Sequence, residues 1–234
     1  MSGTPFDLQL LNLCAALLLL LSFAMLAQRR IVSLVNLLAI QGTLLLSATL
    51  LLAWRTGQHH LYLSAALTLA LKVILLPWLL HRLIRRLQVY WDTEPLLNIP
   101  GTMLVGVLVV VFSFGLAQPI SAAASTATRS AIGIAVAVVL LSFITMITRR
   151  KAMSQVIGFL SMENGLFFGA MSATYGMPMI VELGVALDVL VAVLVLGVFF
   201  FQIREQFDSF DLHHLESLKD TGAGTAPPRS GEGS

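Results

Sequence analysis

Three ionisable residues lie near the middle of long apolar stretches of this sequence: Lys72, Glu163 and Asp188. A charged side chain at the centre of a bilayer costs about 2.5–3.5 kcal/mol on insertion scales, so such residues are retained mainly where protein or water surrounds them. Carboxyl and amino groups in that position can take up and release protons. These residues therefore indicate ion or proton handling inside a membrane.

The two central acids are candidates for a proton relay. Glu163 lies far from both ends of its apolar stretch, so its carboxyl group cannot easily reach surface water. Burial raises the proton affinity of a carboxyl group and a nearby cation lowers it, and a balance between the two lets the group load and release a proton near neutral pH. Asp188 is similarly central. For both residues we favour a relay over the alternative, a structural hydrogen bond to a neighbouring helix.

Two further charges have less certain roles in the sequence. Glu182 lies near the outer end of its stretch and on a different helix face from Asp188. We therefore favour a role at the membrane interface for Glu182, and the alternative is that it forms the exit of a proton path. Lys72 either tunes a facing acid, acts in the relay itself, or forms a static ion pair that fixes how helices dock. Pro77, five residues later, frees the backbone carbonyl of Val73, which either permits a packing kink or holds a water or the lysine ammonium.

The remaining intramembrane polar residues indicate packing rather than chemistry. Asn36, Gln41 and Asn164 are expected to form interhelical hydrogen bonds worth about 1 kcal/mol or less. The single cysteine, Cys14, has no intrachain partner and is expected in the core. Because the chain has no Cys or His pattern with ligand spacing, we expect it to hold no metal or cofactor and to have no catalytic residue.

The composition is that of an integral membrane protein. The chain of 234 residues is 57% hydrophobic and 11% charged, whereas a soluble domain carries about 25% charged residues. The net charge of +2 is too small to indicate nucleic-acid binding. We therefore predict an all-α protein in the lipid bilayer.

Seven apolar stretches are long enough to cross a bilayer, which takes about 20 residues. They lie near 8–28, 31–54, 60–84, 102–123, 131–148, 153–175 and 179–203. The run Asn98-Ile-Pro-Gly is expected to precede the fourth stretch. The first stretch is interpreted as a retained helix, not a signal peptide, because basic residues follow it and no cleavage site leads into a polar domain.

Basic residues determine the predicted orientation. Eleven of them lie on one side of the predicted spans and only Arg55 and Arg129 lie on the other. The eleven are Arg29, Arg30, Arg82, Arg85, Arg86, Arg149, Arg150, Lys151, Arg204, Lys219 and Arg229. Because cytoplasmic segments carry the excess of Lys and Arg, we predict an N-terminus on the outer side of the membrane and a cytoplasmic C-terminus.

The third and seventh stretches resemble each other. Residues 66–75 and 182–191 align without gaps at four identical positions, and Lys72 becomes equivalent to Asp188. Each of these stretches follows one that begins just after a pair of arginines. This pattern predicts seven transmembrane helices arranged as a 3+1+3 parallel internal repeat, as in transport-type folds.

The repeat divides the chain into four parts. Residues 1–90 form an N-terminal three-helix membrane block, residues 91–130 a connecting fourth helix, and residues 131–204 a second three-helix block. Residues 205–234 form a cytoplasmic tail, expected to be disordered after about residue 220 because its composition cannot bury a core.

The second block resembles the three-helix K-type subunit of respiratory complex I and its relatives in cation/proton antiporters. The matching features are the Arg149-Arg150 loop, an intramembrane acid in the second helix (Glu163) and a mid-membrane acid in the third (Asp188). In that family the first acid directly follows a Gly-Leu pair. Here Leu160 occupies that place, and Glu163 follows three residues later on the same helix face.

Across about residues 5–220, the chain resembles hydrogenase-4 component E, a membrane subunit of formate-hydrogenlyase-like, complex-I-related hydrogenases. The resemblance implies a non-catalytic subunit of a redox-driven proton-translocating complex, with Lys72, Glu163, Asp188 and Glu182 in a proton path. It implies antiporter-like and quinone-site-like membrane partners and, indirectly, a peripheral NiFe-hydrogenase arm that holds the cofactors. The alternatives are a subunit of a multisubunit cation/proton antiporter and a purely structural membrane scaffold.

Overall fold

The computed structural model describes residues 6–57, 59–87, 98–121 and 126–174. It also describes the separate positions 184, 186, 187, 189, 190, 193 and 197. The chain divides into two compact units, Met1–Ala192 and Val193–Ser234, and all the helices named below belong to the first unit.

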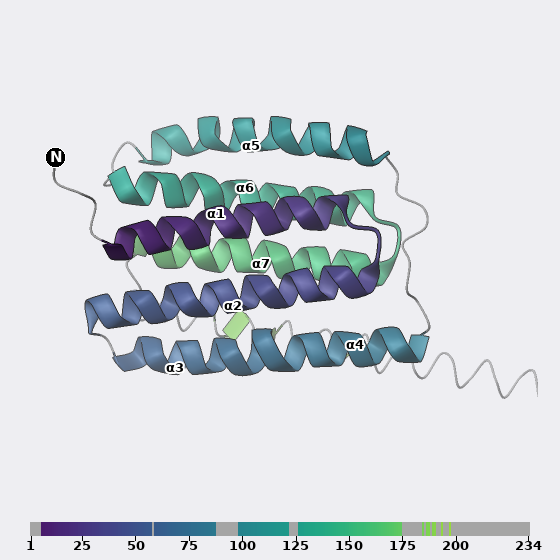
Figure 1. Cartoon of the computed structure of the whole chain (residues 1–234), viewed down its shortest axis with the longest axis horizontal. Helices are drawn as coiled ribbons and strands as arrows, with labels where there is room; N and C mark the ends of the chain where they lie inside the picture. The colour runs from purple at the N-terminus through teal and green to yellow at the C-terminus, as the bar shows by residue number, and fades with distance from the viewer. Residues whose placement is uncertain are drawn as a thin grey trace, which may run out of the picture. The chain divides into compact units, whose positions relative to one another are not determined.

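Every element within the described residues is a helix, which confirms the predicted all-α class. In chain order the helices are α1 (Phe6–Ala27), α2 (Ile31–Thr56), α3 (His59–Thr68), the π-helix η1 (Leu69–Leu75), α4 (Leu76–Leu87), α5 (Ile99–Ser121), α6 (Thr126–Thr148) and α7 (Ala152–Thr174). In Figure 1, α6 packs against α5, α1 and α7, and α2 lies between α7 and the α3–η1–α4 rod.

Six helical segments in the described residues are long and apolar enough to cross a membrane, so the chain is a multi-pass membrane protein. They are Gln9–Ala27, Ile31–Thr56, Leu61–Arg86, Ile99–Gln118, Ser130–Thr148 and Ala152–Thr174. Each coincides with one of the first six predicted stretches to within a few residues. The seventh stretch lies mostly outside the described residues, and so does the predicted tail. The seventh span and the 3+1+3 repeat therefore stay predictions.

The start of α5 differs from the sequence-based expectation. The Asn98-Ile-Pro-Gly run was expected to precede the helix, but α5 begins at Ile99 and includes Pro100 in its first turn. Proline is tolerated there because the first-turn N–H groups have no intrahelical acceptor. The backbone N–H and the hydroxyl of Thr102 both donate to the Asn98 carbonyl, at 2.9 and 3.0 Å, and so close this turn.

Three glycines allow α7 to pack closely against α6. A Cβ added to Gly158, Gly165 or Gly169 would lie 2.8–2.9 Å from a side-chain atom of α6. Their spacing places all three on one face of α7. Because membrane helices associate through close packing of small residues, this face fixes α7 against α6 and leaves its other face for polar contacts with the third span.

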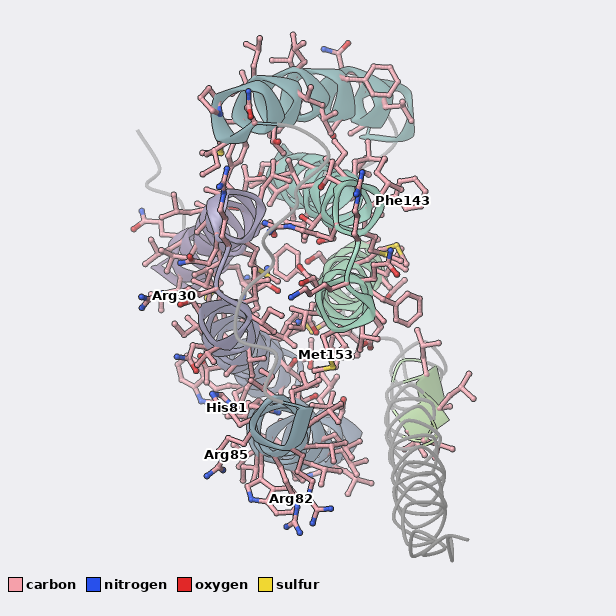
Figure 2. All side chains as sticks on the ribbon, turned by 90° about the vertical axis from the view of Figure 1, so that its right-hand side faces the viewer. Arg30, His81, Arg82, Arg85, Phe143 and Met153 are labelled. Carbon is pink, nitrogen blue, oxygen red and sulfur yellow. The ribbon has the colours of Figure 1, made fainter. Side chains whose placement is uncertain are left out.

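Three exposed arginines lie together at one end of the helices. Figure 2 looks onto that end, where Arg30, Arg82 and Arg85 point away from the packed helices. All three are exposed. This placement agrees with the clustering of basic residues on one side of the predicted spans.

Candidate functional site

Lys72 and Glu163 form a buried ion pair between the third and sixth spans. The Lys72 Nζ lies 2.8 Å from Glu163 Oε1 and donates a second hydrogen bond to Asn164 Oδ1 at 3.0 Å. The Lys72 and Glu163 side chains are only 3% and 2% exposed. Two of the central charges identified in the sequence therefore meet, although 91 positions separate them along the chain.

The lysine lies in a π-helical segment. In η1 (Leu69–Leu75), the wider turn ends where the Leu76 N–H bonds to the Leu71 carbonyl, five residues back. Pro77 follows directly and cannot donate a hydrogen bond, and its ring opposes close approach of the carbonyl four residues earlier. The sequence indicated a disturbance near Pro77 but not its type. Single turns of π-helix are rare and are frequent at functional sites.

Helix α2 comes very close to this segment at Gly42. A Cβ added to Gly42 would lie 3.3 Å from the Lys72 carbonyl oxygen and 3.4 Å from the Lys72 Cβ. Such contacts are tight for any side chain, so glycine is what lets α2 pack on the backbone of the π-helix.

Two further features surround the ammonium group. The Phe167 ring centroid lies 5.1 Å from Lys72 Nζ, within the range of a cation–π contact. A cavity of about 10 Å³ adjoins the pair, which is roughly the volume that one water molecule needs. The cavity is lined by Leu38, Lys72, Leu76, Leu160, Glu163 and Asn164. The pair therefore lies in a mostly apolar surrounding with room for at most a very small guest.

Two buried hydroxyl groups extend the polar surface away from the pair. Ser64 and Thr68 precede Lys72 at helical spacing, and their side chains are 2% and 1% exposed. Within the described part of the chain, neither hydroxyl has a hydrogen-bond partner. By contrast, Thr49 and Thr145 each donate to the carbonyl four residues earlier. Sequence analysis missed Ser64 and Thr68, although their spacing of four and eight residues from Lys72 is a usable signal.

Polar pairs also link other spans. Gln41 Nε2 donates to Ser22 Oγ at 3.0 Å, between α2 and α1. The hydroxyl groups of Ser142 and Ser161 lie 2.8 Å apart, between α6 and α7. The interhelical hydrogen bond predicted for Gln41 is thus confirmed. The one predicted for Asn164 is also confirmed, since its side chain accepts a hydrogen bond from Lys72. The prediction for Asn36 is wrong, because its side chain is exposed on α2.

The other two charged candidates lie outside the described residues. The roles of Glu182 and Asp188 therefore stay predictions. Among the residues that the structure does describe, no group of three or more His, Cys, Asp or Glu could hold a metal ion. The site geometry therefore consists of one ion pair, one amide, an aromatic ring and a stripe of hydroxyl groups.

Comparison with known proteins gives one strong and one distant similarity. The chain is 36% identical over 221 residues to the uncharacterized protein Rv0085 of Mycobacterium tuberculosis, covering 94% of this chain and 100% of that protein. It is 24% identical over 181 residues to hydrogenase-4 component E of Escherichia coli strain K12, covering 77% of this chain and 84% of that protein. The Shigella flexneri protein of the same name matches equally. No protein-family model matches the chain, and no solved structure matches it significantly.

Proposed function

Because the chain belongs to the family of Rv0085 and is a distant relative of hydrogenase-4 component E, we propose that it is a non-catalytic membrane subunit of a redox-driven, proton-translocating hydrogenase complex. The observation that carries the proposal is the buried pair of Lys72 and Glu163. A charged pair in a bilayer interior is costly to build, and a proton path is the best-attested reason for keeping one there.

The geometry suggests how the pair moves a proton. A proton delivered to Glu163 Oε1 neutralises the carboxylate and leaves the Lys72 ammonium without its counter-charge. In a low-dielectric surrounding this favours loss of a proton from Lys72 Nζ to the next acceptor. Transfer of the Glu163 proton to the neutral lysine then restores the starting pair. In the charged state of the lysine, Asn164 Oδ1 and the Phe167 ring hold the ammonium group in place.

Further elements of the proposal follow the family resemblance. Asp188 and Glu182 are the proposed continuation of the path in the seventh span. The proposed partners are antiporter-like and quinone-site-like membrane subunits and, through them, a peripheral hydrogenase arm. The proposed location is the bacterial inner membrane with the N-terminus in the periplasm, which the exposed arginines at one end of the helices support (Figure 2).

A second candidate role is a structural one. An ion pair that joins the third and sixth spans can hold two parts of the protein in register without moving a proton. Removing one partner of a buried pair leaves an uncompensated charge and typically costs about 3–5 kcal/mol. This candidate therefore predicts that every substitution in the pair acts through stability and abundance alone.

The test separates proton transfer from stability. Glu163→Gln keeps the size and hydrogen bonding of the side chain but cannot change charge, so we expect assembly to persist while proton movement per electron falls several-fold. The measurement is redox-driven proton uptake by membrane vesicles at matched subunit abundance. Combining Glu163→Gln with Lys72→Met removes the unpaired cation and should restore stability without restoring proton movement.

The matched control for these variants is Thr43→Val, which removes a polar group from an exposed position in the middle of α2. It should leave both abundance and proton movement unchanged. Normal assembly of the Glu163→Gln complex with wild-type proton movement would contradict the relay and leave the structural role.

A further inference from the structure

Two arginines that follow different helices come together at one end of the bundle. Arg29 follows α1 and Arg149 follows α6, and both line one cavity. The other lining residues are Leu26, Ala27, Ile99, Thr102 and Thr148. We call this cavity the Arg29–Arg149 pocket. Its volume is about 10 Å³, roughly what one water molecule needs, so it can receive a single oxygen atom of a ligand that lies mainly outside it.

The pocket lies at the level where lipid headgroups meet the protein. Ala27, Ile99 and Thr148 are terminal residues of three candidate membrane spans, and all three line the pocket. Three spans therefore end around it, whichever way the protein is oriented. Leu26, one residue deeper in its span, adds an apolar wall.

The charge of Arg149 is fixed in place by α1. Its side chain is 4% exposed. Its Nη2 donates to the carbonyls of Leu26 at 3.2 Å and Met25 at 3.4 Å, and also to the carbonyl of Gln28. These carbonyls form the C-terminal end of α1, where the helix dipole favours a cation. The arginine is therefore held rigidly, and its positive charge contributes to the wall of the pocket.

Arg29 supplies a donor that lacks an acceptor. Its backbone N–H bonds to the Gln28 side-chain oxygen at 3.1 Å. Its guanidinium Nε is buried and has no hydrogen-bond partner among the described residues. Among the described residues that line the pocket, none is acidic. The buried Arg29 Nε–H without an acceptor, next to the fixed charge of Arg149, suits an anionic acceptor supplied by a ligand.

We propose that the Arg29–Arg149 pocket binds the phosphate of an anionic phospholipid headgroup. Guanidinium groups match phosphate oxygens in geometry and charge, and basic pockets between membrane helices are known sites for anionic lipid headgroups. The first turn of α5, which starts at Ile99, adds the partial positive charge of a helix N-terminus. The lipid phosphate bridges α1, α5 and α6 at their ends, and its acyl chains stay in the bilayer.

The test uses the full chain, purified in detergent with the subunits that it brings down and stripped of bound lipid. Phosphatidylglycerol should raise the midpoint temperature of unfolding by several degrees. Phosphatidylcholine with the same acyl chains should have little effect, because its headgroup carries no net charge. Inorganic phosphate at equal concentration tests the free ion, and a shift as large as that from phosphatidylglycerol would overturn the assignment to a lipid.

The variant of choice is Arg29→Gln, because Arg149 also holds the end of α1. Arg29→Gln should abolish most of the phosphatidylglycerol shift, and Arg29→Lys should keep part of it. Arg86→Gln, which removes an exposed arginine at the same end of the helices, is the control and should keep all of it. An unchanged shift in Arg29→Gln would contradict the proposal.

A second measurement covers the case in which Arg29→Gln does not fold. In native mass spectrometry of the wild-type protein, phosphatidylglycerol should stay bound at collision energies that remove phosphatidylcholine, and Arg29→Lys should lower that difference. Equal retention of the two lipids by the wild-type protein would overturn the proposal.

Discussion

Lys72 and Glu163 each reduce the cost of burying the other, but the pair as a whole is not a strong source of stability. Removing two charges from water costs several kcal/mol for each ion, and their attraction offsets this only when hydrogen bonds satisfy the remaining groups. Asn164 and the Phe167 ring supply part of that compensation on the lysine side. A relay needs proton exchange without large reorganisation, and the 2.8 Å contact between the two groups allows direct transfer.

At the residue scale, Ser64 and Thr68 give the next prediction. If their hydroxyl groups carry protons between Lys72 and the start of α3, then Ser64→Ala and Thr68→Val should reduce redox-driven proton movement. Stability should be unchanged or rise slightly, because an unpaired buried hydroxyl costs about 1–3 kcal/mol. The measurement pairs proton uptake with thermal unfolding of the purified protein.

The control for these hydroxyl variants is Thr49→Val. Thr49 is equally buried but donates to the Leu45 carbonyl at 2.9 Å, so its loss removes an existing hydrogen bond. We expect it to lower stability slightly and to leave proton movement unchanged. If both Ser64→Ala and Thr68→Val move protons at the wild-type rate, the two hydroxyl groups do not carry protons.

At the scale of the element, the π-helix and α2 form one unit. The wider turn of η1 carries Lys72, and the Lys72 backbone packs against Gly42. The lysine therefore reaches Glu163 from a segment whose shape depends on a neighbouring helix. A change of shape in η1 would change the distance between the two charges.

Substitution of Gly42 tests this dependence. Gly42→Ala places a Cβ 3.3 Å from the Lys72 carbonyl oxygen, and Gly42→Val adds further atoms to the same contact. Overpacking of this kind typically costs about 1–3 kcal/mol. We therefore expect a lower unfolding temperature and reduced proton movement, with Gly42→Val more severe than Gly42→Ala.

Gly115→Ala in α5 is the matched control, because a Cβ there meets nothing within 4 Å. It should be neutral or stabilise the protein by roughly 0.5–1 kcal/mol, as glycine lowers helix stability relative to alanine. If Gly42→Val and Gly115→Ala give the same stability and activity, the close contact between α2 and η1 has no mechanical role.

The sequence predicted the spans well because length and hydropathy alone decide whether a helix can cross a bilayer. It could not predict that Lys72 faces Glu163, since that depends on how each helix is rotated about its axis. The start of α5 was misplaced because the Asn98-Ile-Pro-Gly run was expected to precede the helix, although a first helical turn accepts proline. Asn36 was assigned an interhelical bond from its position in an apolar stretch, which does not show the face on which it lies.

At the scale of the whole molecule, two interhelical polar contacts support the proposed internal repeat. Ser22 pairs with Gln41 and Ser142 with Ser161, and each pair spans 19 positions between successive spans. Both members of the second pair follow their counterparts by 120 positions, from 22 to 142 and from 41 to 161. Arg149 follows Arg29 by the same 120 positions. These three positions share one offset within the first two spans of each block, whereas the third and seventh stretches align at an offset of 116 positions, so the proposed repeat requires a four-residue difference before its last span.

A parallel repeat requires α1 and α6 to cross the membrane in the same direction. The Arg149 guanidinium binds carbonyls at the C-terminal end of α1, so the loops after α1 and α6 must lie on the same side. The excess of basic residues at those loops and after α4 supports the proposed orientation, in which that side faces the cytoplasm. Topology reporters fused after Arg86 and Lys151 should therefore read as cytoplasmic, and those fused after Arg55 and Tyr175 as periplasmic. If the fusions at all four positions give the opposite readings, the proposed orientation is reversed but the parallel arrangement is kept. If fusions after Arg30 and Lys151 report different sides of the membrane, the repeat itself is contradicted.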